Sequence, residues 1–105
     1  MRPALLPLFA LALLAASPSG HTAGNPEQGE QLAYTCTGCH GVTGYKNAYP
    51  SYSVPKIGGQ SESYLVNALS AYQRGERRHP TMSAQAESLS EQDIADIAAY
   101  LSSVK

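Results

Sequence analysis

The chain of 105 residues has no tryptophan, one phenylalanine and two cysteines, and only 14% of its residues are charged. The phenylalanine is Phe9, so residues 25–105 contain neither of these large side chains to fill a core. A domain of that length buries a small fraction of its surface and often needs disulfides, a metal or a cofactor for stability. Two cysteines are too few for a disulfide framework. We therefore expect one small domain with a further component at its centre.

The distribution of charge argues against nucleic-acid binding. The formal net charge is −1, and the chain has no basic stripe of the kind that follows a phosphate backbone. Residues 70–82 carry three arginines and one glutamate, a balance of +2, whereas residues 83–105 carry four acidic residues and one lysine, a balance of −3. We expect the folded molecule to have a charge dipole.

The amino-terminal segment has the three-part layout of a secretory signal. Met1-Arg2-Pro3 is positive, residues 4–16 are mostly apolar, and residues 17–20 are small and polar. We predict a signal peptide over residues 1–24, cleaved between about 17 and 24, with the folded domain in residues 25–105. The apolar run is too short to span a bilayer comfortably, so we expect a soluble periplasmic protein without stable membrane insertion. An uncleaved anchor is the alternative.

One short motif, Cys36-Thr37-Gly38-Cys39-His40, indicates the chemistry of the chain. Covalent haem attachment needs two thiols, each of which adds to one vinyl group, and a histidine beside them that ligates the iron. A dithiol redox site has the same cysteine spacing, but the strands of a thioredoxin-like βαβ unit are absent. A zinc finger needs a second ligand pair, and the other histidines, His21 and His79, are isolated. We predict one covalent haem, with a redox dithiol and structural zinc as the alternatives.

Met82 is the only methionine outside the predicted leader. It follows Pro80 and Thr81 in a segment that we interpret as a loop, an unusual place for a methionine that fills a core. We predict that its sulfur binds the iron opposite His40, with ordinary packing as the alternative and His79 as the rival ligand. A histidine and methionine pair raises the reduction potential and suits electron transfer.

Capping residues and helical periodicity predict three main helices. The first begins at the cap Asn25 and runs to about Thr35, the second covers residues 61–74, and the third begins with the capping-box-like pair Ser90 and Asp93. Glycine within a helix is unfavourable by roughly 1 kcal/mol against alanine. The first helix contains Gly29, which therefore predicts a close approach of the last helix, near Tyr100 or Leu101.

The remaining segments have turn-rich composition. Residues 41–59 are rich in Gly, Tyr, Ser and Pro and lack a helical or alternating period, so we predict an ordered loop that a porphyrin edge would hold. We predict a second loop over residues 76–81 and one short helical turn over residues 82–88.

With these features the sequence resembles the class I c-type cytochromes, specifically the short bacterial mono-haem form and the single domains of the diheme cytochromes. The resemblance implies an all-α cytochrome c fold in which three main helices and long loops surround one covalently bound haem c. It covers nearly all of residues 25–105 in the right order. The matching residues are Gly29 and Leu32, the segment 36–41, the segment 55–60, Tyr64 and Leu65, the segment 80–82, and the segment 89–101.

The resemblance also implies roles for particular residues. Cys36 and Cys39 would form the two thioethers, and His40 and Met82 would be the axial ligands of the iron. The carbonyl of Pro55 would accept the Nδ1 proton of His40.

Ile57 would pack on the porphyrin face, where the family more usually has leucine. A second departure from the diheme relatives is that the chain carries one haem motif.

The function implied is that of a soluble, exported, mono-haem electron carrier, not an enzyme. It would pass single electrons between redox protein partners by outer-sphere transfer through the haem edge, without a small-molecule substrate. The alternatives are a haem enzyme or gas-binding sensor with a labile Met82, and a haem subunit of a larger oxidoreductase complex.

Two further hypotheses concern charged and aromatic side chains. Carboxylates at the edge of an apolar pocket need partners, and the candidate donors to the haem propionates are Tyr49, Tyr52, Lys46, Lys56 and Arg74. The arginines of residues 74–78 could steer docking to an acidic partner. For both groups the alternative is an ordinary solvated surface.

Overall fold

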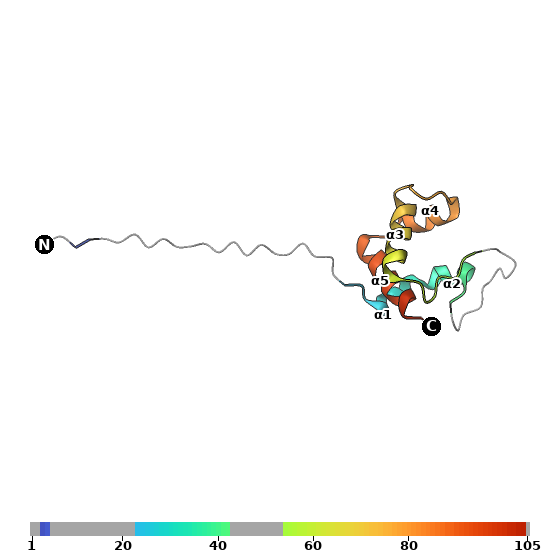
Figure 1. The fold of residues 1–105 in the computed structure, drawn as a ribbon, viewed down its shortest axis with the longest axis horizontal. Coiled ribbons are helices and arrows are strands. Elements are labelled where there is room, and N and C mark those ends of the chain that lie inside the picture. Colours follow the sequence, from blue (N-terminus) through green and yellow to red (C-terminus); the bar gives the residue numbers. More distant parts are fainter. Residues whose placement is uncertain (1–2, 5–22, 43–53, 105) are drawn as a thin grey trace.

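The computed structural model describes residues 3–4, 23–42 and 54–104, which form helices and no strand (Figure 1). The all-α class is therefore confirmed. The helices are α1 (Pro26–Leu32), α2 (Tyr34–His40), α3 (Glu62–Gln73), α4 (Pro80–Glu87) and α5 (Glu91–Ser103). Most of the predicted leader and much of the first predicted loop lie outside the described residues. Within the described part of the chain, no helix is long and apolar enough to cross a membrane.

The starts of the three predicted helices are confirmed because each depends on a local cap. The Asn25 side chain accepts hydrogen bonds from the N–H groups of Glu27 and Gln28, with Pro26 at the first helical position. Ser90 and Asp93 form a complete capping box at the start of α5, and Ser61 caps α3.

The predicted end of the first helix is wrong. We expected it to continue to about Thr35, but α1 ends at Leu32 and the haem motif lies on a separate helix, α2. Ala33 joins the two helices, and its carbonyl accepts from the N–H groups of both Cys36 and Thr37, at 2.9 and 3.3 Å. This shared bond tightens the turn and gives α2 a new direction.

The prediction for residues 76–88 also needs correction. In place of a loop that includes Pro80 and then one short turn, an eight-residue helix begins at Pro80 itself. Proline suits the first helical position because its missing N–H would have no partner there. His79 caps this helix, since its Nδ1 accepts from the Met82 N–H at 3.3 Å. Met82 therefore lies in the first turn of α4.

Helices α1 and α5 cross in close backbone contact at Gly29, as the sequence predicted. A Cβ on Gly29 would lie 1.9 Å from the Asp96 carbonyl oxygen and 2.9 Å from the Tyr100 Cβ. The side chain of Asp96, buried in this contact, accepts a hydrogen bond of 2.7 Å from the Asn25 N–H. These contacts place α2, which follows α1 directly, against the same small core.

The core is small. The largest side chains with almost no exposed surface in the part of the chain described are Ile94, Ile97 and Leu101, each 2% exposed. The other buried hydrophobic residues are Ala33, Val42, Leu65, Ala86 and Ala98. A domain with so few large buried side chains needs another apolar body for stability.

Candidate haem-binding site

The two cysteines and the histidine of the motif lie on α2 (Figure 1). Cys36 is three residues before Cys39 and four before His40, a spacing that brings side chains to one face of a helix. Both cysteines are free and half-buried. Burial raises the pKa of the Cys36 thiol above its ordinary value. A redox-active cysteine needs a lowered pKa, so this environment argues against the dithiol alternative.

The histidine of the motif has one ring nitrogen already engaged. His40 Nδ1 lies 2.7 Å from the carbonyl oxygen of Pro55, across fifteen positions of sequence. A carbonyl oxygen can only accept, so Nδ1 carries the proton and donates it. In the neutral ring Nε2 is then left with a lone pair, the state that a metal-ligating histidine requires.

The segment that carries Pro55 is held by the end of α5. The Gly59 N–H donates to the Leu101 carbonyl at 2.8 Å. Gly59 has φ +77°, a conformation that glycine adopts without strain. Ile57, in the same segment, is half-buried and packs against the core cluster that Cys36 also contacts. The structure therefore brings Pro55, Ile57 and α2 together at one side of the core.

Met82 is half-buried on a different part of the molecule. Among the helices described, α4 packs against α3 and no other, whereas α2 contacts α1. The backbones of the helices that carry His40 and Met82 thus do not pack directly against each other. Iron ligation by Met82 stays a prediction. His79, the rival ligand, has a structural role as the cap of α4 without any iron.

The candidate propionate donors are only partly described. Lys46, Tyr49 and Tyr52 lie outside the described residues. Lys56 is exposed, and Arg74 forms an exposed ion pair of 3.0 Å with Glu76. No group of three or more His, Cys, Asp or Glu residues in the described ranges could hold a metal ion, so structural zinc has no support there.

Sequence reasoning missed one residue that contacts the helix of Met82. The side-chain amide of Gln73, at the end of α3, bonds to backbone carbonyls at the far end of α4 and just after it. A glutamine near a helix end is common, so neither the residue type nor its position predicted this contact. The contact became visible only when α4 was seen to lie against α3.

One short helix beside a small apolar core carries two free thiols and a histidine whose Nε2 is available. These features define a protein that attaches haem covalently. Residues 26–105 match the family model described as Cytochrome c, and the chain belongs to this family.

Relatives and solved structures agree with this assignment. Cytochrome c-554(548) of Halomonas halodenitrificans is 44% identical over 84 residues, covering 77% of this chain and 98% of that protein. Cytochrome c4 of Pseudomonas aeruginosa is 39% identical over 85 residues, covering 81% of this chain and 41% of that protein. The crystal structure of reduced cytochrome c4 from Pseudomonas stutzeri has a TM-score of 0.65 and 27% identity, covering 80% of this chain and 53% of that one.

The chain thus spans nearly the whole length of the Halomonas relative and about half the length of the cytochromes c4. Its fold is the cytochrome c fold, and its function is electron transfer. One haem c is bound covalently through Cys36 and Cys39. The donor set described above fits this group, because the two thiols and the free nitrogen of His40 are the atoms that it needs.

Proposed function

We propose that this protein is an exported, mono-haem electron carrier of the periplasm that exchanges single electrons with redox protein partners and has no small-molecule substrate. The observation that carries the proposal is the 2.7 Å contact of His40 Nδ1 with the Pro55 carbonyl, which keeps Nε2 directed to metal binding. Export is supported by the signal-like composition of residues 1–24.

Different residues of the chain have different roles at the site. The haem, when bound, supplies a one-electron couple. Cys36 and Cys39 would anchor it, and His40 would bind the iron through Nε2, with its ring orientation set by Pro55. Met82 would supply a soft thioether sulfur to the iron, which would favour the ferrous state and raise the reduction potential. Ile57 contributes apolar surface against the ring.

Replacement of Met82 tests the sixth ligand. In the unchanged protein we expect slow or no carbon monoxide binding in the reduced state, and a thioether-to-iron charge-transfer band in the oxidised state. Met82→Ala should abolish that band, lower the reduction potential and open the iron to rapid carbon monoxide binding, because no soft ligand then occupies the site. Absorbance spectra of both oxidation states, with and without carbon monoxide, measure the charge-transfer band and carbon monoxide binding. A redox titration measures the reduction potential.

The matched control is His79→Asn, because asparagine keeps the capacity to cap α4 but removes the imidazole. This variant should retain the charge-transfer band. If His79→Asn loses the sixth ligand and Met82→Ala keeps it, the assignment of Met82 is wrong. Rapid carbon monoxide binding by the unchanged protein would support a haem enzyme or gas sensor instead.

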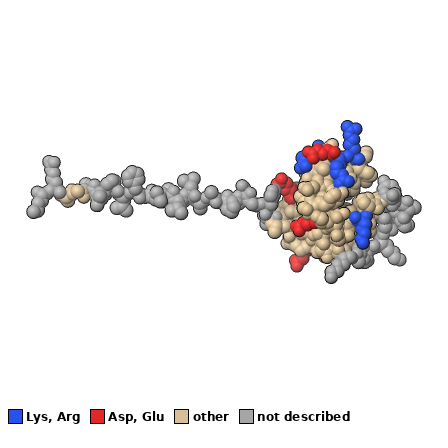
Figure 2. All heavy atoms as spheres, viewed as in Figure 1, with Lys and Arg blue, Asp and Glu red and all other residues tan. Residues whose placement is uncertain are grey.

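We propose that the partner docks on a basic patch, defined here as Arg77 and Arg78 in the turn between α3 and α4. Figure 2 shows Lys and Arg side chains gathered over this part of the molecule. Arg74 contributes little to the patch because Glu76 neutralises it. The Arg77 guanidinium lies 4.7 Å from the centre of the Tyr72 ring and donates to the Tyr64 hydroxyl at 3.4 Å. These contacts hold one charge of the patch in place beside the start of α4.

Charge reversal tests the basic patch. Arg77→Glu with Arg78→Glu should slow electron transfer to ferricyanide, an anionic oxidant, by about tenfold at low salt, because long-range attraction becomes repulsion. At an ionic strength of about 1 M, where the screening length is about 3 Å, the difference should nearly vanish. Stopped-flow rates across a salt series measure this effect.

The control is the exchange Arg74→Glu with Glu76→Arg, which inverts an existing ion pair and leaves the net charge unchanged. Its rate should stay within about twofold of the unchanged protein at every salt concentration. Equal rates for the charge-reversed and unchanged proteins at low salt would remove the docking proposal.

A further inference from the structure

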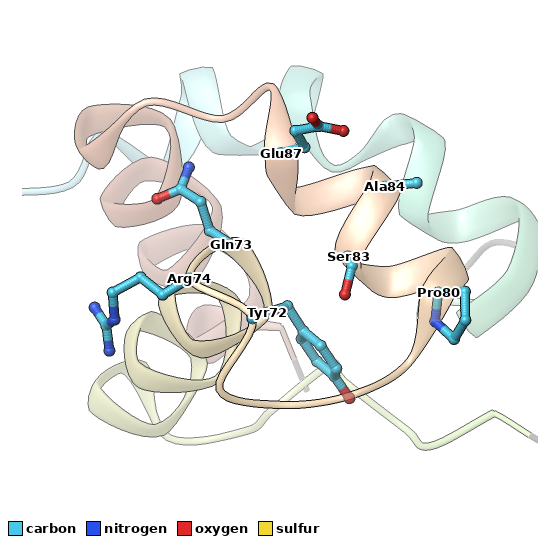
Figure 3. A pocket seen from close by; sticks show the side chains of 8 residues that line it. Tyr72, Gln73, Arg74, Pro80, Ser83, Ala84 and Glu87 are labelled. Carbon is cyan, nitrogen blue, oxygen red and sulfur yellow. The ribbon is translucent and has the colours of Figure 1, made fainter.

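The helix that carries Met82 has one neighbour among the helices that the structure describes. Among the described helices, α4 contacts only α3. An open hollow of about 500 Å³ separates part of the two, between the last turn of α3 and the face of α4 that includes Pro80, Ser83, Ala84 and Glu87. Figure 3 shows Arg74 extending away from α4, so this arginine does not bridge the hollow. Close packing therefore fastens α4 along only part of its length.

One polar side chain joins the two helices beside this hollow. Gln73 Nε2 donates to the Ala86 carbonyl at 3.2 Å and to the Leu89 carbonyl at 2.5 Å. In the described part of the chain, no other α3 side chain has a hydrogen bond to α4 or to the turn after it. Ala86 itself is fully buried. The Gln73 amide and the small side chain of Ala86 thus hold the carboxyl end of α4.

The chemistry of the contact explains why the residue is a glutamine. The Ala86 carbonyl near the end of α4 accepts from the Leu89 N–H at 3.1 Å, and the Gln73 amide adds a second donor to it. The Leu89 carbonyl lies beyond the helix and accepts from the same amide. A side-chain amide offers two N–H bonds on one nitrogen, enough for both carbonyls. Glutamate would place a carboxylate oxygen, which can only accept, beside two carbonyl oxygens. Leucine would leave both carbonyls without this donor.

We propose that Gln73 is a positioning residue for the sixth iron ligand: its amide holds α4 on α3 and thereby keeps the Met82 sulfur on the iron. This inference rests on the proposed ligation by Met82. A short helix moves as a unit, so release at Ala86 and Leu89 also frees the first turn, where Met82 lies. The Gln73 contact then determines how often the iron is accessible to another ligand.

The test compares imidazole binding to the oxidised haem protein, because imidazole competes with Met82 for the iron. Gln73→Leu and Gln73→Glu should each raise the apparent affinity for imidazole by about tenfold, the effect expected from losing hydrogen bonds that favour the methionine-bound state. Without imidazole, both variants should keep the thioether charge-transfer band.

Gln92→Leu is the matched control. The Gln92 amide also makes a hydrogen bond, to Asp96 at 2.8 Å on α5, but α5 does not contact α4. This variant should bind imidazole with an affinity within about twofold of the unchanged protein, although its unfolding midpoint falls. An equal change in Gln92→Leu and the Gln73 variants, or no change in the Gln73 variants, overturns the proposal.

Amide hydrogen exchange of the unchanged protein supplies a measurement that does not depend on the variants folding. The amides of α4 should lose protection when imidazole saturates the iron, while those of α3 and α5 keep theirs. Unaltered protection in α4 overturns the proposal. If the unchanged oxidised protein lacks the charge-transfer band, Met82 ligation itself fails. If the band is present and the Gln73 variants behave as the unchanged protein does, only the role of Gln73 fails.

Discussion

Replacing both Cys36 and Cys39 by serine is expected to abolish covalent haem attachment and to leave residues 25–105 largely unfolded. Three large side chains in the described part of the domain, those of Ile94, Ile97 and Leu101, are only 2% exposed. Without the bound ring this core is too small to offset a conformational entropy cost of roughly 1 to 2 kcal/mol per residue. Haem staining after denaturing electrophoresis and the far-ultraviolet circular dichroism spectrum measure the two effects.

The experiment requires a host able to attach haem to the unchanged protein. Tyr34→Phe serves as the control, since Tyr34 lies on the same helix but is 73% exposed. It should stain for haem and fold as the unchanged protein does. A folded, helical and colourless double-serine variant would contradict the view that haem completes the core.

Gly29→Ala is expected to destabilise the protein by at least about 3 kcal/mol, at the upper end of the usual cost of overpacking. The new methyl group would lie 1.9 Å from the Asp96 carbonyl oxygen, a backbone atom of α5 that cannot move unless the helix moves. Alanine favours the helix over glycine by only about 1 kcal/mol, so the clash decides the sign. Urea unfolding of the haem-bound protein measures the change.

Gly75→Ala separates this clash from the general cost of replacing glycine. Gly75 ends α3 with φ +75°, and an added Cβ would meet no atom within 4 Å. The expected loss is therefore the backbone strain alone, about 1 to 2 kcal/mol. A loss at Gly29 no larger than the loss at Gly75 would show that the two helices can separate without serious cost.

Elements that depend on short-range interactions were predicted from the sequence, and those that depend on long-range packing were not. The starts of α1, α3 and α5 were predictable because a cap bonds to groups two or three residues away. The beginning of α4 was missed because Pro80 and His79 suit both a loop and a helix start. The break at Ala33 was missed because it depends on burial of that residue in the core.

The candidate site shows the same division. The motif of residues 36–40 identifies its chemistry directly, since both thiols and the histidine are neighbours in the sequence. Pro55 was expected only through the family resemblance, and no property of the residue itself predicts a bond to His40. Gln73 was not expected at all, because its acceptors lie in α4 and in the turn after it, whose position is set by tertiary packing.

By itself, the sequence determined that the protein binds one haem through Cys36 and Cys39, belongs to an all-α class, and brings a helix close to Gly29. Those conclusions depend on covalent chemistry, local caps and the absence of a side chain. Only the tertiary structure decided that His40 presents Nε2, that Met82 lies on a helix, and that Gln73 bonds to the end of that helix and to the turn after it. These features join residues far apart in the chain, and the packing of α1, α3 and α5 brings their partners within reach.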